Sequence, residues 1–253
     1  MEETPPGGFI DLHCHILPGV DDGPGEMATA LAMARMAVAE GTGTLLATPH
    51  FKADGYEETP EKSPPIFQQL VAALAEEGIA LQLGLAAEVH LGAEIFGWLR
   101  KGRVPWLNRV GERRYLLLEF PFGGVEPGQS YMTELLVKQG ITPILAHPER
   151  IRDFRKDPDR LGPFLKMGCL TQITAGSLSG QFGEGVRQTA ETILERGWVT
   201  VLASDGHHIY RRQPVLSDGF REAAKLIGRS AALRLVTTNP QAILAGEGVC
   251  QFR

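Results

Sequence analysis

Cysteine is scarce in this chain of 253 residues, with three widely separated positions, Cys14, Cys169 and Cys250. Thiols spaced in this way favour neither a disulfide framework nor a zinc ribbon. Reduced, buried thiols are typical of a cytoplasmic protein, and we expect this localisation.

Long apolar runs are also missing, since no segment could span a bilayer. Residues 1–8 are acidic and lack an apolar core, so we expect a flexible extension rather than a signal peptide. The formal net charge is −5, and no Lys/Arg-rich stripe is present to neutralise a phosphate backbone. We therefore expect neither membrane insertion nor a nucleic-acid partner.

Short apolar runs that stop at polar residues are plentiful. The first begins at residue 9 and ends in the sequence DLHCH at 11–15. As a strand it would turn His13 and His15 to one face and Cys14 to the other, because side chains alternate along a strand. Two imidazoles at this spacing converge on one point and indicate a metal site.

The same pattern recurs along the chain in six further runs, which are 44–49, 80–85, 115–118, 141–146, 169–174 and 198–204. Their polar ends are, in order, His50, Glu88, Glu119, His147, the Ala175-Gly176-Ser177 turn, and Asp205 with His207. Each predicted strand therefore carries its polar side chains at its carboxyl end.

Helical spacing of apolar residues separates these runs. The predicted helices are 24–40, 64–77, 93–100, 127–139, 157–167, 185–196 and 218–227. Strands that alternate with helices pair in parallel through crossover connections. The sequence therefore predicts an α/β barrel in a single domain, 1–253, with the polar segments 56–65 and 122–128 as rim loops.

The polar strand ends and one loop supply nine candidate metal ligands, too many for one ion. They are His13, His15, Asp22, His50, Glu88, Glu119, His147, Asp205 and His207. Mixed imidazole and carboxylate ligands suit zinc, manganese or iron. Several divalent ions in one site are typical of phosphate-ester hydrolysis.

These residues lie in motifs that resemble the polymerase-and-histidinol-phosphatase (PHP) superfamily. The motifs are HCH at 13–15, VDDGP at 20–24, TPH at 48–50, Glu88, AHPER at 146–150, AGSL at 175–178 and SDGH at 204–207. Within the superfamily the chain resembles bacterial manganese-dependent protein-tyrosine phosphatases of the capsule and exopolysaccharide type. The resemblance extends from Asp11 to about Pro214.

The resemblance implies a distorted seven-stranded (β/α)7 TIM-like barrel that binds three divalent ions, Mn2+ in the first place and otherwise iron or zinc. It also implies a substrate, phosphotyrosine on protein, such as the tail of a bacterial tyrosine kinase that controls polysaccharide synthesis. Position by position, one metal takes His13, His15, Glu88 and Asp205. A second takes Glu88, Glu119 and His147, and a third takes Asp22, His50 and His207. Asp21 replaces Asp22 if the loop register differs.

Two arginines near the strand ends are candidate catalytic residues. The resembling family uses arginines at the positions of Arg150 and Arg212, and a guanidinium binds phosphate oxygens bidentately. Arg211 remains an alternative to Arg212. Arg152 and Arg155 are interpreted as solvent-exposed charges.

Three alternative functions are considered for the same sequence. A histidinol-phosphate phosphatase would have the same ligands. A dinuclear amidohydrolase is disfavoured because the fourth strand ends in Glu119 rather than in a lysine. A non-enzymatic module that docks on a kinase is disfavoured, because such a module would not need the full set of candidate metal ligands. An aromatic rim favours a phosphotyrosyl substrate, and its predicted members are Phe51, Tyr56, Phe120, Phe122, Phe182 and Tyr210.

Overall fold

The computed structural model describes residues 7–108 and 110–249. Residues 1–6, most of the predicted flexible extension, lie outside this part. The next two residues lead directly into the first strand, and Gly8 packs so tightly against Gly41 that a Cβ atom on it would lie 2.7 Å from the Gly41 carbonyl oxygen.

The strands all pair in parallel and form two sheets. Their bounds are β1 Phe9–Cys14, β2 Thr42–Ala47, β3 His50–Phe51, β4 Gln82–Leu85, β5 Glu88–His90, β6 Arg114–Glu119, β7 Ile141–Ala146, β8 Leu170–Thr174 and β9 Val201–Ala203. The first sheet has the order β1-β2-β4, and the second has the order β3-β5-β6-β7-β8-β9.

The predicted strands 44–49 and 80–85 each correspond to two short strands, the second of which lies beyond the predicted end. Only Thr48 and Pro49 separate β2 from β3, and only Ala86 and Ala87 separate β4 from β5. The first of each pair lies in the small sheet and the second lies in the large sheet. Counted with their breaks, the described strands are the seven that the sequence predicts, and the breaks account for the distortion.

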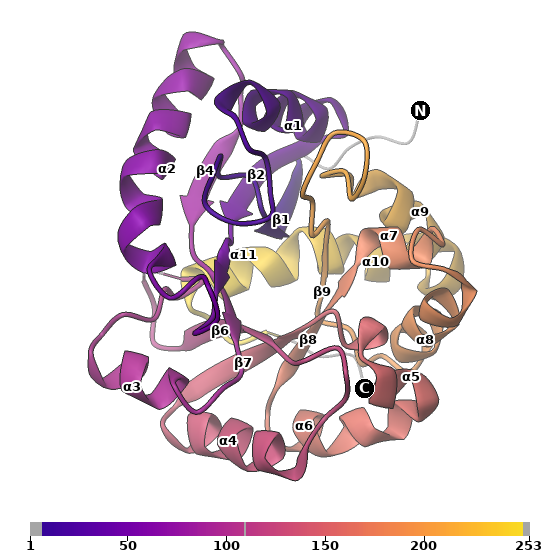
Figure 1. Cartoon of the computed structure of the whole chain (residues 1–253). Helices are drawn as coiled ribbons and strands as arrows, with labels where there is room; N and C mark the ends of the chain where they lie inside the picture. The colour runs from indigo at the N-terminus through magenta and orange to yellow at the C-terminus, as the bar shows by residue number, and fades with distance from the viewer. Residues whose placement is uncertain (1–6, 109, 250–253) are drawn as a thin grey trace.

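The barrel closes between β9 and β1. The Asp205 amide donates to the His13 carbonyl oxygen at 2.8 Å, and the His15 amide donates to the Gly206 carbonyl oxygen at 2.8 Å. The predicted α/β barrel is thus confirmed, with most of its helices around the outside of the strands (Figure 1).

The helices follow the predicted alternation with some differences. Their bounds are α1 Met27–Ala39, α2 Thr59–Glu76, α3 Ile95–Arg100, α4 Pro127–Lys138, α5 Arg152–Lys156, α6 Gly162–Lys166, α7 Ala175–Leu178, α8 Glu184–Glu195, α9 Ser217–Ile227, α10 Arg229–Val236 and α11 Thr238–Ala245, with the 3-10 turns η1 Pro148–Arg150 and η2 Pro158–Leu161. The predicted helix 157–167 is divided into η2 and α6, and α5, α7, α10 and α11 were not predicted. Within the described ranges, no helix combines the length and apolar character needed to cross a membrane.

The predicted rim loop 56–65 is wrong in its second half, because α2 begins at Thr59. Pro60 is tolerated there, since amides of the first turn have no helical partner. Pro64 and Pro65 lie deeper in the helix, where the buried Leu70 and Leu74 pack it against the barrel. Tertiary packing therefore overrides the local proline signal.

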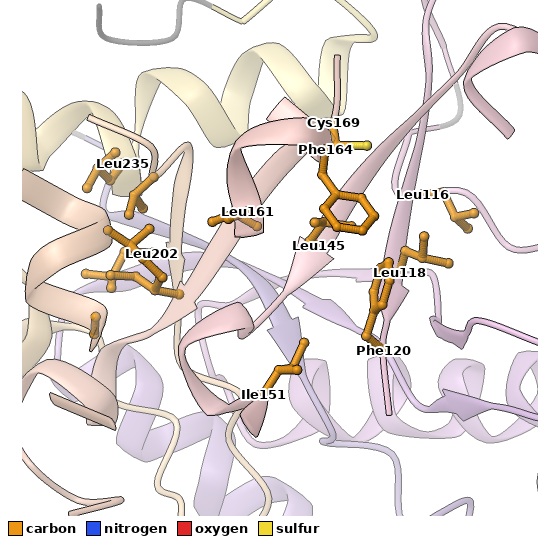
Figure 2. Packing of buried hydrophobic residues seen from close by; sticks show 14 of the residues in the cluster. Leu116, Leu118, Phe120, Leu145, Ile151, Leu161, Phe164, Cys169, Leu202 and Leu235 are labelled. Carbon is orange, nitrogen blue, oxygen red and sulfur yellow. The ribbon is translucent and has the colours of Figure 1, made fainter. Parts of the chain in front are cut away.

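Alternating residues of β6 separate an inner apolar cluster from an outer one. Leu117 packs inside with Ile144 of β7, whereas Leu116 and Leu118 face the outer layer of helices. Figure 2 shows part of the outer cluster, in which Phe120 and Phe164 lie beside Leu118 and Leu145. By the same alternation Glu119 lies on the inner face with Leu117. The Glu119 carboxylate therefore points into the barrel mouth.

Candidate metal centre

The nine predicted ligands come together at the carboxyl ends of the strands. They are His13 in β1, His15 just after it, Asp22 in the loop before α1, His50 in β3, Glu88 in β5, Glu119 in β6, His147 after β7, and Asp205 and His207 after β9. Three overlapping groups have donor atoms within 4.8 Å of one another: His15, Asp22, His50 and His207; His13, His15 and Glu88; His50, Glu88 and Glu119.

Four side chains form the most buried part of the centre. His13 Nε2 lies 3.1 Å from His15 Nε2, 3.5 Å from Glu88 Oε1 and 3.3 Å from Asp205 Oδ1. His15 Nε2 lies 3.5 Å from both Glu88 Oε2 and Asp205 Oδ1. All four side chains are at most 1% exposed.

The distances from the histidine nitrogens to each other and to the carboxylate oxygens fit a divalent cation. Neighbouring donors around a tetrahedral metal with bonds of about 2.1 Å lie roughly 3.4 Å apart. Buried polar atoms without a hydrogen-bond partner also point into the centre, among them Asp205 Oδ1 and His207 Nε2. Because such atoms are costly to bury unsatisfied, the donor set suits a bound metal better than a bare pocket.

Asp22 organises a second part of the centre. Its Oδ1 atom lies 3.3 Å from His50 Nε2 and 3.3 Å from His207 Nε2. The ring of His15 stacks on His207 with centroids 3.9 Å apart, so this part adjoins the first. Two imidazoles and a carboxylate are again a donor set for a transition metal.

Glu88, one of the four buried side chains, also contacts His147 and His50. Its Oε1 atom lies 2.8 Å from His147 Nε2, and its Oε2 atom lies 2.9 Å from His50 Nδ1. Glu119 lies 3.7 Å from the same His50 nitrogen. The structure thus groups Glu119 with His50, whereas the resemblance pairs Glu119 with His147. The assignment of ligands to individual metals stays a prediction.

The protonation of this region also favours a cation. Burial raises the pKa of Glu119 to about 7, and the nearby Glu88 carboxylate adds to the effect. Two crowded carboxylates are relieved by a positive ion between them. Burial and the Arg150 guanidinium lower the pKa of His147 to about 4, which favours the neutral imidazole that binds metals.

Two polar residues orient the histidines, and sequence reasoning missed both roles. Asp21 Oδ2 accepts a hydrogen bond from His15 Nδ1 at 2.6 Å and another from the His50 amide at 3.0 Å. Gln172 of β8 accepts from His13 Nδ1 at 2.8 Å. Each contact leaves the Nε2 atom facing the centre, as outer partners of metal-bound histidines do. Asp21 therefore supports a ligand, while its neighbour Asp22 faces the imidazoles.

Asp205 links the metal centre to the two predicted arginines. Its Oδ2 atom accepts hydrogen bonds from Arg150 Nη1 and, at 2.6 Å, from Arg212 Nη2. Burial opposes ionisation of Asp205, but His13 and the two arginines hold its pKa well below the usual range. Arg211 is exposed, so the structure brings Arg212 rather than Arg211 to the centre.

Backbone strain is concentrated at the same residues. Among non-glycine residues in the described part, positive φ occurs at His147 (32°), Asp205 (51°) and Arg212 (52°). This region is unfavourable for residues with a Cβ atom and persists where the surrounding structure enforces it. The strain turns each side chain toward the centre at the end of its strand or loop.

The predicted aromatic rim is only partly correct. Phe51 and Phe120 are fully buried in the outer core and are not rim residues. Phe51 lies within β3, and Phe120 directly follows the end of β6. Phe122 and Tyr210 are exposed, at 45% and 81%, and Tyr56 approaches His50 with ring centroids 5.8 Å apart.

Neither cysteine in the described part is suited to nucleophilic catalysis. Cys14 is buried away from the centre, and its Sγ atom donates to the Gly206 carbonyl oxygen. Burial raises the pKa of the Cys169 thiol to about 12. Cys250 lies outside the described residues. The chemistry of the site therefore rests on the imidazoles, carboxylates and guanidiniums.

A parallel α/β barrel with clustered histidines and carboxylates at its mouth defines the broad class of barrel metallohydrolases. Similarity to known proteins narrows the class. The family described as "Capsular polysaccharide synthesis, CpsB/CapC" matches residues 9–245. The chain belongs to this family.

Individual relatives agree with the assignment. The tyrosine-protein phosphatase YwqE of Bacillus subtilis is 33% identical over 241 residues, which cover 95% of this chain and 93% of YwqE. The tyrosine-protein phosphatase CpsB of Streptococcus pneumoniae is 31% identical, over 93% of this chain and 98% of CpsB.

Solved structures support the same fold. A chain from the crystal structures of YwqE and CpsB, described there as metal-dependent tyrosine phosphatases, aligns with a TM-score of 0.88 at 31% identity, over 96% of this chain and 97% of that chain. The lactonase Lmo2620 of Listeria monocytogenes aligns with a TM-score of 0.54 at 12% identity, over 95% of both chains, which shows a shared fold alone.

Proposed function

We propose that this chain is a metal-dependent protein-tyrosine phosphatase, a phosphoric monoester hydrolase that serves capsular or exopolysaccharide synthesis. The observation that carries the proposal is the buried set His13, His15, Glu88 and Asp205 beside Arg150 and Arg212. The two histidine nitrogens lie 3.1 Å from each other and 3.3 to 3.5 Å from the carboxylate oxygens. Membership of the CpsB/CapC family and the likeness to YwqE support the tyrosine phosphatase assignment.

The donor set supports three divalent cations, which we propose to be Mn2+, with iron or zinc as alternatives. His13, His15, Glu88 and Asp205 would hold one, Asp22, His50 and His207 would hold another, and Glu119 and His147 would complete the third with Glu88. Such cations polarise phosphoryl oxygens and neutralise their charge.

The two arginines have a separate role. Arg150 and Arg212 both donate to Asp205 Oδ2, so their guanidiniums lie directly beside the centre. A phosphoryl group at the centre would lie within their reach. Each guanidinium can bind phosphate oxygens and stabilise the charge that develops in the transition state.

The depth of the centre supports phosphotyrosine as the substrate. The buried ligands lie below rim residues such as Phe122 and Tyr56. A phosphotyrosine holds its phosphate farther from the peptide backbone than a phosphoserine does, so it can reach recessed cations. The tyrosine-rich tail of a bacterial kinase, met in the cytoplasm, would supply such a substrate.

The test compares phosphotyrosine peptide, phosphoserine peptide and histidinol phosphate with Mn2+-loaded protein. We expect kcat/KM to be highest for the phosphotyrosine peptide. After chelation activity should vanish, and Mn2+ should restore it better than Mg2+, which binds imidazoles poorly. A preference for histidinol phosphate would instead identify the chain as a histidinol-phosphate phosphatase. The fold and the proposed metal centre would still stand.

A further inference from the structure

The guanidinium of Arg150 contacts two aromatic rings. Its Cζ atom is 4.9 Å from the centroid of Phe122 and 4.6 Å from the centroid of Phe182. Both distances are within the range of cation–π attraction. Two rings therefore support Arg150 while its Nη1 atom donates to Asp205.

The two rings differ in their surroundings. Phe182 is half-buried and covers the turn after β8, because a Cβ atom on Gly176 would lie only 3.3 Å from its ring. Phe122 is 45% exposed and stacks on the imidazole of His147 with centroids 5.3 Å apart. Phe182 thus contacts Arg150 from the half-buried side. Phe122 contacts the predicted ligand His147 and is partly exposed to solvent.

The backbone around Phe122 is well anchored. Its carbonyl oxygen accepts from the Arg152 amide at 3.2 Å, and Asp153 Oδ2 accepts from the Val125 amide at 3.0 Å. These bonds tie the loop after β6 to the start of α5. The backbone of Phe122 is therefore held in place at the rim.

We propose that the exposed part of Phe122 contacts the phenyl ring of the substrate and selects aryl phosphates over alkyl phosphates. The inference rests on the proposed phosphatase function and names a residue that determines its specificity. A phosphate bound between Arg150 and the centre has its ester oxygen close to Phe122, and in a phosphotyrosine the ring is attached directly to that oxygen. Phosphoserine offers only a short aliphatic chain at the same place.

The size of the effect follows from aromatic pairing. An aromatic pair contributes enough beyond simple burial to change an equilibrium or rate by about 3- to 10-fold. Phe122→Leu keeps an apolar side chain but removes the ring. The ratio of kcat/KM for phosphotyrosine peptide to kcat/KM for a phosphoserine peptide of the same sequence should fall by this factor.

Two companion variants separate recognition from support of Arg150. Phe182→Leu should slow both substrates alike and leave the ratio unchanged. Tyr131→Leu, at an exposed aromatic residue of α4, should change neither rate. Circular dichroism and metal content verify that each variant is folded and loaded.

A second readout measures binding without turnover. Phenylphosphonate and cyclohexylphosphonate are inhibitors of similar size, and Phe122→Leu should weaken inhibition by the phenyl compound more. If Phe122→Leu keeps both the substrate ratio and the inhibitor ratio, or if Phe182→Leu alone lowers them, the assignment to Phe122 is overturned. If the parent protein prefers histidinol phosphate, the proposed function itself fails, and the inference fails with it for that distinct reason.

Discussion

The two oxygens of Asp205 have different neighbours. Oδ1 faces His13 and His15 at 3.3 and 3.5 Å, and Oδ2 accepts from Arg150 and Arg212. One carboxylate thereby fixes the arginines relative to the ligands. Loss of an arginine should consequently affect turnover without removing a metal ligand.

We expect Arg150→Ala and Arg212→Ala each to lower kcat/KM by on the order of 10²-fold while metal content is retained, because each removes a positioned positive charge. Steady-state kinetics and elemental analysis measure the two quantities. Arg211→Ala is the control, since Arg211 is exposed beside its functional neighbour. Equal activity of the Arg212 and Arg211 variants would contradict the assignment.

Asp21 offers a test of ligand orientation. Its carboxylate accepts from His15 Nδ1 and from the amides of His50 and Gly23. Asp21→Asn replaces an acceptor oxygen by a donor and removes the charge, so the affinity for Mn2+ should fall by about 10-fold or more. Titration of chelator-treated protein with Mn2+ measures this.

The exposed Asp54 provides the matched control, because Asp54→Asn removes the same charge at a position that forms no hydrogen bond or ion pair with the predicted ligands in the described part of the chain. An unchanged affinity in the Asp21 variant would show that His15 keeps its orientation without this carboxylate. A similar loss in both variants would indicate a general effect of net charge.

At the level of the elements, the alternation of apolar runs with helical segments was sufficient to predict the seven strands. It also predicted the edge of the barrel at which their polar ends meet. The interruptions were not predictable, because Thr48-Pro49 and Ala86-Ala87 resemble ordinary strand ends. Nor was the burial of Phe51 and Phe120, which depends on helices that pack from elsewhere in the chain.

The limits at the site have a similar physical origin. Residue type and position were sufficient to predict that the nine candidate ligands lie together, since imidazoles and carboxylates at parallel strand ends converge. The choice between Arg211 and Arg212 depended on a positive φ at Arg212, and the role of Gln172 depended on its contact across the barrel with His13. Sequence-distant contacts of this kind leave no local pattern.

The packing of α9 against α7 can be tested at a single glycine. A Cβ atom on Gly219 would lie 2.6 Å from the Ala175 Cα atom, which is closer than real contacts allow. Gly219→Ala should therefore lower the free energy of unfolding by about 1–3 kcal/mol, as overpacking does. Urea denaturation measures the change.

Gly128 in α4 is the control, because nothing lies within 4 Å of a Cβ atom placed there. Gly128→Ala should leave stability unchanged or raise it slightly, since alanine favours helix. If the two substitutions have the same effect, the close approach of α9 to α7 is not limiting.

For the whole molecule, metal binding should be coupled to folding. The predicted ligands come from β1, β3, β5, β6, the loop before α1 and the segments after β1, β7 and β9, so the unfolded chain has no preformed centre. Mn2+ at a hundred times its dissociation constant should add about 2.7 kcal/mol of stability. For a chain of this size the midpoint of thermal unfolding should rise by roughly 5–10 °C.

Differential scanning calorimetry of chelator-treated protein, with and without Mn2+, measures this shift. His13→Ala should reduce it, because the variant lacks one buried donor. A midpoint that does not depend on Mn2+ would mean that the centre binds metal weakly or that the unfolded chain binds it equally well.

The closure of the barrel has a consequence for biosynthesis. The bonds between Asp205 and His13 and between His15 and Gly206 join the first strand to the last. A ribosome adds about 5–20 residues per second, so the first histidines wait on the order of ten seconds or more for these partners. Until then the nascent chain has an open strand edge and an incomplete set of donors. A metal centre that uses Asp205 and His207 can therefore be completed only after these residues have been translated, late in the synthesis of the chain.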